Sequence, residues 1–265
     1  MIELTIDGKV LSAREGASIL DACRAHRIPV PTLCHHEGVE PYGGCRLCMV
    51  EIGHPEWGDW TGLVTSCLYA VKAGLVVQTG SPKVVEVRRQ LLDLLLAQAP
   101  AAKAVAALAR SYGLTQSSYA ARDPENKCIL CGLCVRVCAA QGPCAIAAQG
   151  RGAGKYIGTP FKKEPDACIG CLSCAHICPT GHITYAETPA GRSIWGRTFE
   201  LLRCGSCGRS HITVAQRDFL TGRTGLGTAY FEPCAECKRL ESAKRFASVG
   251  TPAAGSIQRE RRDAQ

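Results

Sequence analysis

Cysteine is the residue type in this sequence whose number and spacing point to chemistry. The chain of 265 residues contains 18 cysteines, and most of them occur in C-x2-C units. This spacing is typical of metal chelation by thiolates, whereas a disulfide scaffold would need a secreted chain. The first residues, MIELTIDGKVLSAREG, lack the charged-then-apolar pattern of a signal peptide and contain no twin-arginine pair. The cysteines are therefore expected to bind metal in the cytoplasm.

One group of cysteines forms a repeated motif, C-x2-C-x2-C-x3-C, which is the pattern of bacterial ferredoxins with two [4Fe–4S] clusters. In this pattern the fourth cysteine of each copy ligates the other cluster. The spacing predicts the first cluster on Cys128, Cys131, Cys134 and Cys178. It predicts the second cluster on Cys168, Cys171, Cys174 and Cys138. A zinc site is the weaker alternative, because both copies match the two-cluster pattern in register. Outside the pattern, Cys144 and Cys23 are expected to be buried thiols.

A second group near the N-terminus has the spacing C-x10-C-x2-C-x18-C and predicts a [2Fe–2S] cluster. Its ligands would be Cys34, Cys45, Cys48 and Cys67. Plant-type ferredoxins share the central C-x2-C but have a shorter first gap. Gly38, Gly43 and Gly44 lie in the longer gap, where the absence of a Cβ lets backbone amides approach the cluster sulfides. A zinc site or a set of unrelated thiols is the alternative.

The last C-x2-C units predict one closed, tetrahedral, structural metal site. Its ligands would be Cys204, Cys207, Cys234 and Cys237. The glycine that follows Cys207 suits a zinc-knuckle turn, and both units are interpreted as knuckles of a small zinc-ribbon-like segment. Zinc is favoured. A third [4Fe–4S] cluster or a single iron ion are alternatives that spacing alone does not separate.

Hydrophobic periodicity predicts the elements that position these cysteines. Strands are expected over residues 2–6, 10–13, 49–52, 63–68 and 75–79, with a helix over 18–26. This order is that of a β-grasp domain. A further helix is expected to bury Val84, Val87, Leu91, Leu94 and Leu95, with Arg88 on another face. Pro100 would end it, and a second helix would cover 101–112.

We therefore predict an α+β fold with consecutive segments. They are a β-grasp [2Fe–2S] ferredoxin domain (1–82), a helical spacer (83–122), a 2[4Fe–4S] ferredoxin domain (123–186), a four-cysteine metal-binding segment (187–245) and a flexible tail (246–265). No apolar stretch has the length of a membrane span.

The formal net charge of +8 could suggest a nucleic-acid partner. This count treats every cysteine as neutral, whereas a bound cysteine is a thiolate. Each of the four predicted metal sites carries a net charge of about −2, so the metal-loaded protein is expected to be close to neutral. The basic composition therefore gives little support to nucleic-acid binding.

The cysteine motifs are also similar to those of a known family. The segments PVPTLCHHEGVEPYGGCRLCMVEI and LVTSC resemble the N-terminal domain of the large iron–sulfur subunit of respiratory complex I. They are equally similar to the small diaphorase subunit of NAD-linked hydrogenases and to the N-terminus of iron-only hydrogenases. The resemblance covers roughly residues 1–186. It implies a non-catalytic electron conduit between a flavin/NADH subunit and a terminal redox enzyme such as a [NiFe] hydrogenase. A formate dehydrogenase as terminal enzyme, or a free-standing polyferredoxin, are the alternatives.

One departure from this family concerns an intermediate [4Fe–4S] site. Members usually bind that cluster with the motif H-x3-C-x2-C-x5-C, between the [2Fe–2S] domain and the ferredoxin block. Residues 68–127 of this chain contain neither histidine nor cysteine. The intermediate cluster is therefore expected to be absent, and an electron path through the chain would skip it or bend around it.

Overall fold

The fold is that of a computed structural model of the chain, which describes residues 1–189 and 191–250. Two compact units make up the chain. The first unit comprises residues 1–168, 172–186 and 194–197, and the described part of the second comprises 169–171, 187–189, 191–193 and 198–250. Residues 246–250 belong to a helix and not to the predicted tail, and the rest of that tail lies outside the described residues.

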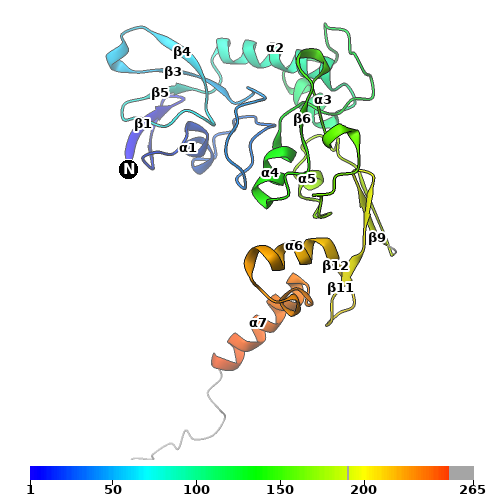
Figure 1. The fold of residues 1–265 in the computed structure, drawn as a ribbon. Coiled ribbons are helices and arrows are strands. Elements are labelled where there is room, and N and C mark those ends of the chain that lie inside the picture. The colour runs from blue at the N-terminus through cyan, green and yellow to red at the C-terminus, as the bar shows by residue number, and fades with distance from the viewer. Residues whose placement is uncertain (190, 251–265) are drawn as a thin grey trace, which may run out of the picture. The chain divides into compact units, whose positions relative to one another are not determined.

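The N-terminal part of the first unit is a five-stranded mixed sheet with the strand order β2-β1-β5-β3-β4 (Figure 1). Its strands are β1 (Ile2–Ile6), β2 (Lys9–Ala13), β3 (Met49–Gly53), β4 (Thr61–Thr65) and β5 (Val76–Gln78). Strands β1 and β5 are parallel, and the other neighbours are antiparallel. The order of strands and helix agrees with the β-grasp prediction.

Helix α1 (Ile19–Ala25) covers this sheet. Ser18 caps its first turn in a reciprocal capping box with Asp21. The buried side of the helix packs with the sheet residues in one apolar core, which excludes water from the strands. Cys23 lies in this core, and burial raises the pKa of its thiol to about 11. The prediction of a buried thiol at this position is confirmed.

The predicted spacer is a pair of helices, α2 (Pro82–Gln98) and α3 (Lys103–Ser111). The buried positions of α2 are Val84, Arg88, Leu92 and Leu96. The prediction is confirmed for Val84, whereas Arg88 was predicted to lie on another face and Leu94, predicted to be buried, is 51% exposed. The leucines of α2 are so closely spaced in the sequence that more than one side of the helix could be its buried face. The side whose residues recur every fourth position faces the core that α2 shares with α3.

The remaining part of the first unit follows the sequence repeat. Helix α4 (Leu133–Gln141) and helix α5 (Ser173–His176) are neighbours, and each contains the third cysteine of its motif. Between them lie the antiparallel strands β6 (Ala147–Gln149) and β7 (Tyr156–Gly158). Short 3₁₀ turns are η1 (Pro55–Trp57), η2 (Gly152–Gly154) and η3 (Pro160–Lys162).

A three-stranded sheet in the order β10-β9-β8 comes next along the chain. Its strands are β8 (Tyr185–Thr188), β9 (Gly191–Ile194) and β10 (Arg197–Phe199). The second unit continues with an antiparallel hairpin of β11 (Leu201–Arg203) and β12 (Ser210–Thr213), then α6 (Val214–Thr224), η4 (Thr228–Phe231) and α7 (Ala235–Gly250). Within residues 1–189 and 191–250, no helix combines the length and the apolar character that a membrane span needs.

Candidate metal centres

The cysteines predicted for the [2Fe–2S] cluster lie around one end of the β-grasp sheet. Cys34 lies in the loop after α1, Cys45 and Cys48 precede β3, and Cys67 follows β4. All are at most 7% exposed. Gly43 and Arg46 have left-handed backbone conformations, with φ of 66° and 60°. Such turns aim successive amide groups toward one side of a loop, where they can stabilise an anionic cluster.

The cysteines of this set lie in two close pairs. The Sγ atoms of Cys48 and Cys67 are 3.4 Å apart, and the N–H of Cys45 donates to the Sγ atom of Cys34 at 3.3 Å. A hydrogen bond from the Cys45 side chain lowers the pKa of Cys34 to about 6, and one from Cys67 lowers the pKa of Cys48 to about 6. One thiolate per pair is therefore favoured before any metal is bound. Two close pairs fit a centre with two irons, each of which takes two thiolates.

One cavity of the first unit brings together all the cysteines predicted for the first [4Fe–4S] cluster. Cys178 from the second motif lines it beside the three cysteines of the first motif, together with Ile129, Gly132, Ile157, Thr180, His182 and Ile183. The packing thus brings Cys178 beside the cysteines of the first motif, and the ligand set of this cluster stays a prediction. The mostly apolar wall suits a cluster that must be kept from water.

The thiols of this cavity are crowded. Burial and the neighbouring cysteines raise the pKa of Cys134 to about 12. Burial acts in the same direction on Cys178, but hydrogen bonds from Thr180 and from the N–H groups of His182 and Ile183 outweigh it and lower the pKa of that thiol. Thiolates gathered in a buried cavity repel one another, and bound iron would remove this repulsion.

The second motif has the same local backbone shape as the first. Leu130 and Gly132 have φ values of 53° and 70°, and the equivalent Gly170 and Leu172 have values of 66° and 62°. A leucine in this conformation is strained by about 1–2 kcal/mol, so a common function of the two loops is indicated. The ligand set of the second cluster stays a prediction. Cys138 accepts a hydrogen bond from the N–H of Ala145.

The prediction that Cys144 is buried is wrong. This cysteine is exposed and has a φ of 52°. It follows Pro143 in the loop between α4 and β6, whose next residues, Ala145 and Ile146, are buried in its place. The local sequence contains enough apolar side chains to fill the core without the thiol.

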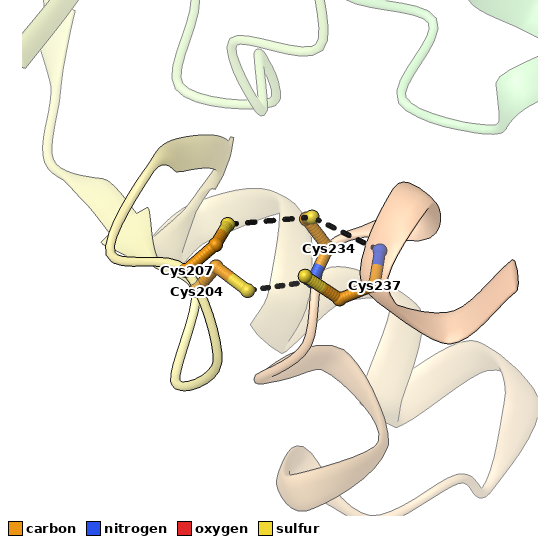
Figure 2. A group of neighbouring side chains, drawn as sticks. All are labelled: Cys204, Cys207, Cys234 and Cys237. Carbon is orange, nitrogen blue, oxygen red and sulfur yellow. Dashed lines mark hydrogen bonds between the residues drawn. The ribbon is translucent and has the colours of Figure 1, made fainter. Parts of the chain in front are cut away.

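The C-terminal cysteines form a compact group in the second unit, and their side chains point toward one another (Figure 2). Cys204 and Cys207 lie in the turn between β11 and β12, where Gly208 has the left-handed φ of 70° that a knuckle needs. Cys234 directly precedes α7 and Cys237 lies in its first turn. The second pair therefore opens a helix and is not the second knuckle of a ribbon. The positive end of the helix dipole favours thiolates there.

The spacing of these sulfurs fits a single ion. All four ligand atoms lie within 4.8 Å of one another, and the Sγ atoms of Cys207 and Cys234 are 3.9 Å apart. A thiolate binds zinc at about 2.3 Å, so two sulfurs on one tetrahedral ion lie about 3.8 Å apart. In a [4Fe–4S] cluster each thiolate binds a different iron, which separates the sulfurs further. Among the described residues, no other group of three potential ligands is as compact.

Two arginines at the cysteine loops were not among the residues predicted from the sequence. Arg88 is buried against the [2Fe–2S] loop. Arg136 in α4 donates to Cys34 O at 2.7 Å and, more weakly, to Cys131 O at 3.5 Å. It also donates to a backbone carbonyl in the loop after Cys34 and lies over the ring of Tyr42. Both copies of the repeated motif have a basic residue at this position, because the counterpart of Arg136 is a histidine. This is the one indication of Arg136 in the sequence.

Comparison with protein families agrees with both cluster types. Residues 1–82 match the family "2Fe-2S iron-sulfur cluster binding domain". Residues 161–184, which contain the second motif, match the family "4Fe-4S binding domain".

Whole-chain comparison finds similar subunits of larger assemblies. The chain is 30% identical over 218 residues to the NADP-reducing hydrogenase subunit HndD of Solidesulfovibrio fructosivorans, covering 71% of this chain and 36% of that subunit. It is 29% identical over 209 residues to the mitochondrial NADH-ubiquinone oxidoreductase 78 kDa subunit of Neurospora crassa, covering 69% and 27%. The chain thus spans about a third of the length of these curated relatives.

A solved structure is also similar in fold. It is the crystal structure of an NAD+-reducing [NiFe]-hydrogenase in the H2-reduced state. One chain of that structure is 30% identical to this one, with a TM-score of 0.54. The match covers 60% of this chain and 75% of that chain.

Proposed function

Since the chain belongs to the family of iron–sulfur subunits found in NAD-linked hydrogenases and in NADH-ubiquinone oxidoreductase, we propose that it is an electron-transfer subunit of an NAD-linked oxidoreductase complex. Its partners would be a flavin/NADH-binding subunit and a terminal redox enzyme such as a [NiFe] hydrogenase, in the cytoplasm. The chain itself would carry no catalytic residue.

The cysteines would hold three iron–sulfur centres, which supply one-electron carriers when bound. The [2Fe–2S] centre would use Cys34, Cys45, Cys48 and Cys67. The two [4Fe–4S] centres would use Cys128, Cys131, Cys134 and Cys178, and Cys168, Cys171, Cys174 and Cys138. The task of the chain is then to bury these centres and to hold them near one another as distinct centres.

The observation that carries this proposal is the contact between two cysteine loops in the first unit. Cys34 and Cys45 of the [2Fe–2S] set and Cys131 of the first [4Fe–4S] set belong to one apolar core. A Cβ atom added to Gly44 would lie 3.9 Å from Cys131 O. The two loops therefore touch, which supports a relay that skips the intermediate cluster expected to be absent.

Arg136 would hold this junction together. Its guanidinium group bonds carbonyl oxygens in both loops, from Cys34 and Cys131. We expect Arg136→Gln to lower the free energy of unfolding by about 1–3 kcal/mol, because charge-assisted hydrogen bonds are lost. We also expect a weaker spin–spin interaction between the two reduced centres in electron paramagnetic resonance (EPR) spectra. Arg110→Gln, at an exposed arginine, is the control. An unchanged spin–spin interaction in Arg136→Gln would contradict this role.

Anaerobic purification from the native host tests the proposed function itself. We expect the chain to elute with a flavin-containing subunit that oxidises NADH and with a hydrogenase subunit. A formate dehydrogenase subunit in place of the hydrogenase would favour the second candidate for the terminal enzyme. A chain that elutes alone in every preparation would indicate a free-standing polyferredoxin and would contradict the proposal.

We propose zinc for the C-terminal four-cysteine site. The compact tetrahedral spacing of Cys204, Cys207, Cys234 and Cys237 supports a single ion. Cys204 is favoured as a thiolate, since hydrogen bonds led by the N–H of Cys234 lower its pKa to about 5. Four thiolates around one ion, with no open position, are typical of structural zinc.

A further inference from the structure

The side chain of Arg88 is a buried cation beside the [2Fe–2S] loop. It projects from α2 and is 4% exposed. Its Nε atom donates to Leu47 O at 3.0 Å, and its Nη2 atom donates to Met49 O at 2.7 Å. These two carbonyl groups flank Cys48. The third donor, Nη1, reaches the hydroxyl group of Tyr112 at 3.3 Å.

All three of these acceptors are neutral. Among the residues that the structure describes, no carboxylate forms an ion pair with Arg88. The acids on the adjoining elements have other partners, since Glu51 on β3 binds Lys83 and Asp93 on α2 accepts a hydrogen bond from Ser117. A buried charge without a counter-ion is strongly unfavourable, so an anion is expected close to the guanidinium group.

We propose that the [2Fe–2S] centre is this anion, and that Arg88 is its internal counter-ion and a positioning residue for its loop. The inference rests on the proposed function, because it requires a cluster on the N-terminal cysteines. Arg88 would act through the backbone carbonyls beside Cys48 and through its charge, without touching the cluster.

The charge of Arg88 has a measurable consequence for the reduction potential. An oxidised [2Fe–2S] centre with four thiolates carries a net charge of about −2, and reduction adds one more electron. A fixed cation in a buried, weakly screened environment stabilises the reduced state more than the oxidised state. Arg88 should therefore raise the potential of this centre. Arg89 is next to it in α2 but is exposed, so solvent screens its charge.

The test is a redox titration of the anaerobic, metal-loaded full-length protein, followed by the EPR signal of the reduced [2Fe–2S] centre. In Arg88→Gln we expect the ratio of reduced to oxidised centre at a fixed potential to fall about tenfold, a shift of about 59 mV for a one-electron couple. Arg89→Gln removes the same formal charge from the same helix and should change this ratio less than about twofold. Arg88→Lys keeps the charge and should stay close to the wild-type ratio.

The outcomes distinguish a failure of the counter-ion role of Arg88 from a failure of the proposed function. If the reduction potential of Arg88→Gln equals that of Arg89→Gln, the counter-ion role of Arg88 is overturned. It is also overturned if Arg88→Lys shifts the reduction potential as far as Arg88→Gln does. If Arg88→Gln fails to assemble the centre, Arg88→Lys carries the test, and its failure to assemble the centre would also overturn the inference. A wild-type protein without any [2Fe–2S] signal would instead refute the proposed function.

Discussion

Replacing Cys178 by alanine is expected to remove the first [4Fe–4S] cluster, although Cys178 belongs to the second motif in the sequence. The reason is spatial, because Cys178 lines the same cavity as Cys128, Cys131 and Cys134. A cluster that loses one of four thiolates exposes an iron and becomes labile. We expect about four iron atoms and four sulfides per chain to be lost, with the EPR signal of the first cluster absent and that of the [2Fe–2S] centre retained.

The matched control for this variant is Cys144→Ala. Cys144 is exposed and lies outside every predicted ligand set, so its replacement should leave the iron content unchanged. If Cys178→Ala abolishes the signal of the second cluster while the first remains, the crossed assignment is incorrect. If both clusters persist at full occupancy, Cys178 is not a ligand.

Much of the first unit could be predicted because the residues that determine its strands, helices and cysteine loops lie close together in the sequence. Strands β1 and β3 alternate between more and less buried positions, and the helix after Ser18 has a polar cap, so short-range rules suffice there. The cysteine motifs carry even more information, since ligand spacing is constrained by the cluster and not by the rest of the fold. For these reasons the order of elements and the gathering of the first [4Fe–4S] cysteines were predictable.

The arginines beside the loops were not predictable for the opposite reason. Arg88 was predicted to lie away from the buried face, because arginine is usually exposed and the leucines of α2 allow several stripes. Only tertiary packing determines that the backbone carbonyls around Cys48 face α2. The helix that begins directly after Cys234 was likewise not predicted, since a C-x2-C unit looks the same in a turn and at the start of a helix.

Loss of the metal from the C-terminal site is expected to unfold the second unit. This unit has few buried apolar side chains among its described residues, Phe199 and Phe231 being the large aromatic ones. Small segments of this kind depend on a metal, and structural zinc contributes about 10–16 kcal/mol of apparent binding free energy in zinc-finger peptides. In Cys237→Ser we expect the bound zinc to fall from about one per chain to a small fraction, and amide exchange in α6 and α7 to become rapid.

The same variant should also affect one loop of the ferredoxin motif. Residues 169–171 belong to the second unit, where Thr213 donates a hydrogen bond to Ile169 O at 2.5 Å and Arg192 donates to Gly170 O at 2.9 Å. When the unit unfolds, these contacts are lost, and we expect the neighbouring Cys171, a predicted ligand of the second cluster, to become mobile. We therefore expect the second [4Fe–4S] cluster to be lost faster on exposure to air, while the [2Fe–2S] centre and the first cluster are retained.

Elemental analysis of the anaerobically purified wild-type protein checks the premise of this prediction. Three iron–sulfur centres and one zinc ion require about ten iron atoms and one zinc ion per chain, whereas a third [4Fe–4S] cluster in place of zinc would raise iron to about fourteen. Cys144→Ser controls for the loss of a thiol as such and should keep both metals. A Cys237→Ser protein with full zinc content and slow exchange in α7 would show that the site does not hold this unit together. Slow exchange after complete loss of zinc would mean that the second unit is held by its small apolar core alone, contrary to what the burial of its side chains indicates.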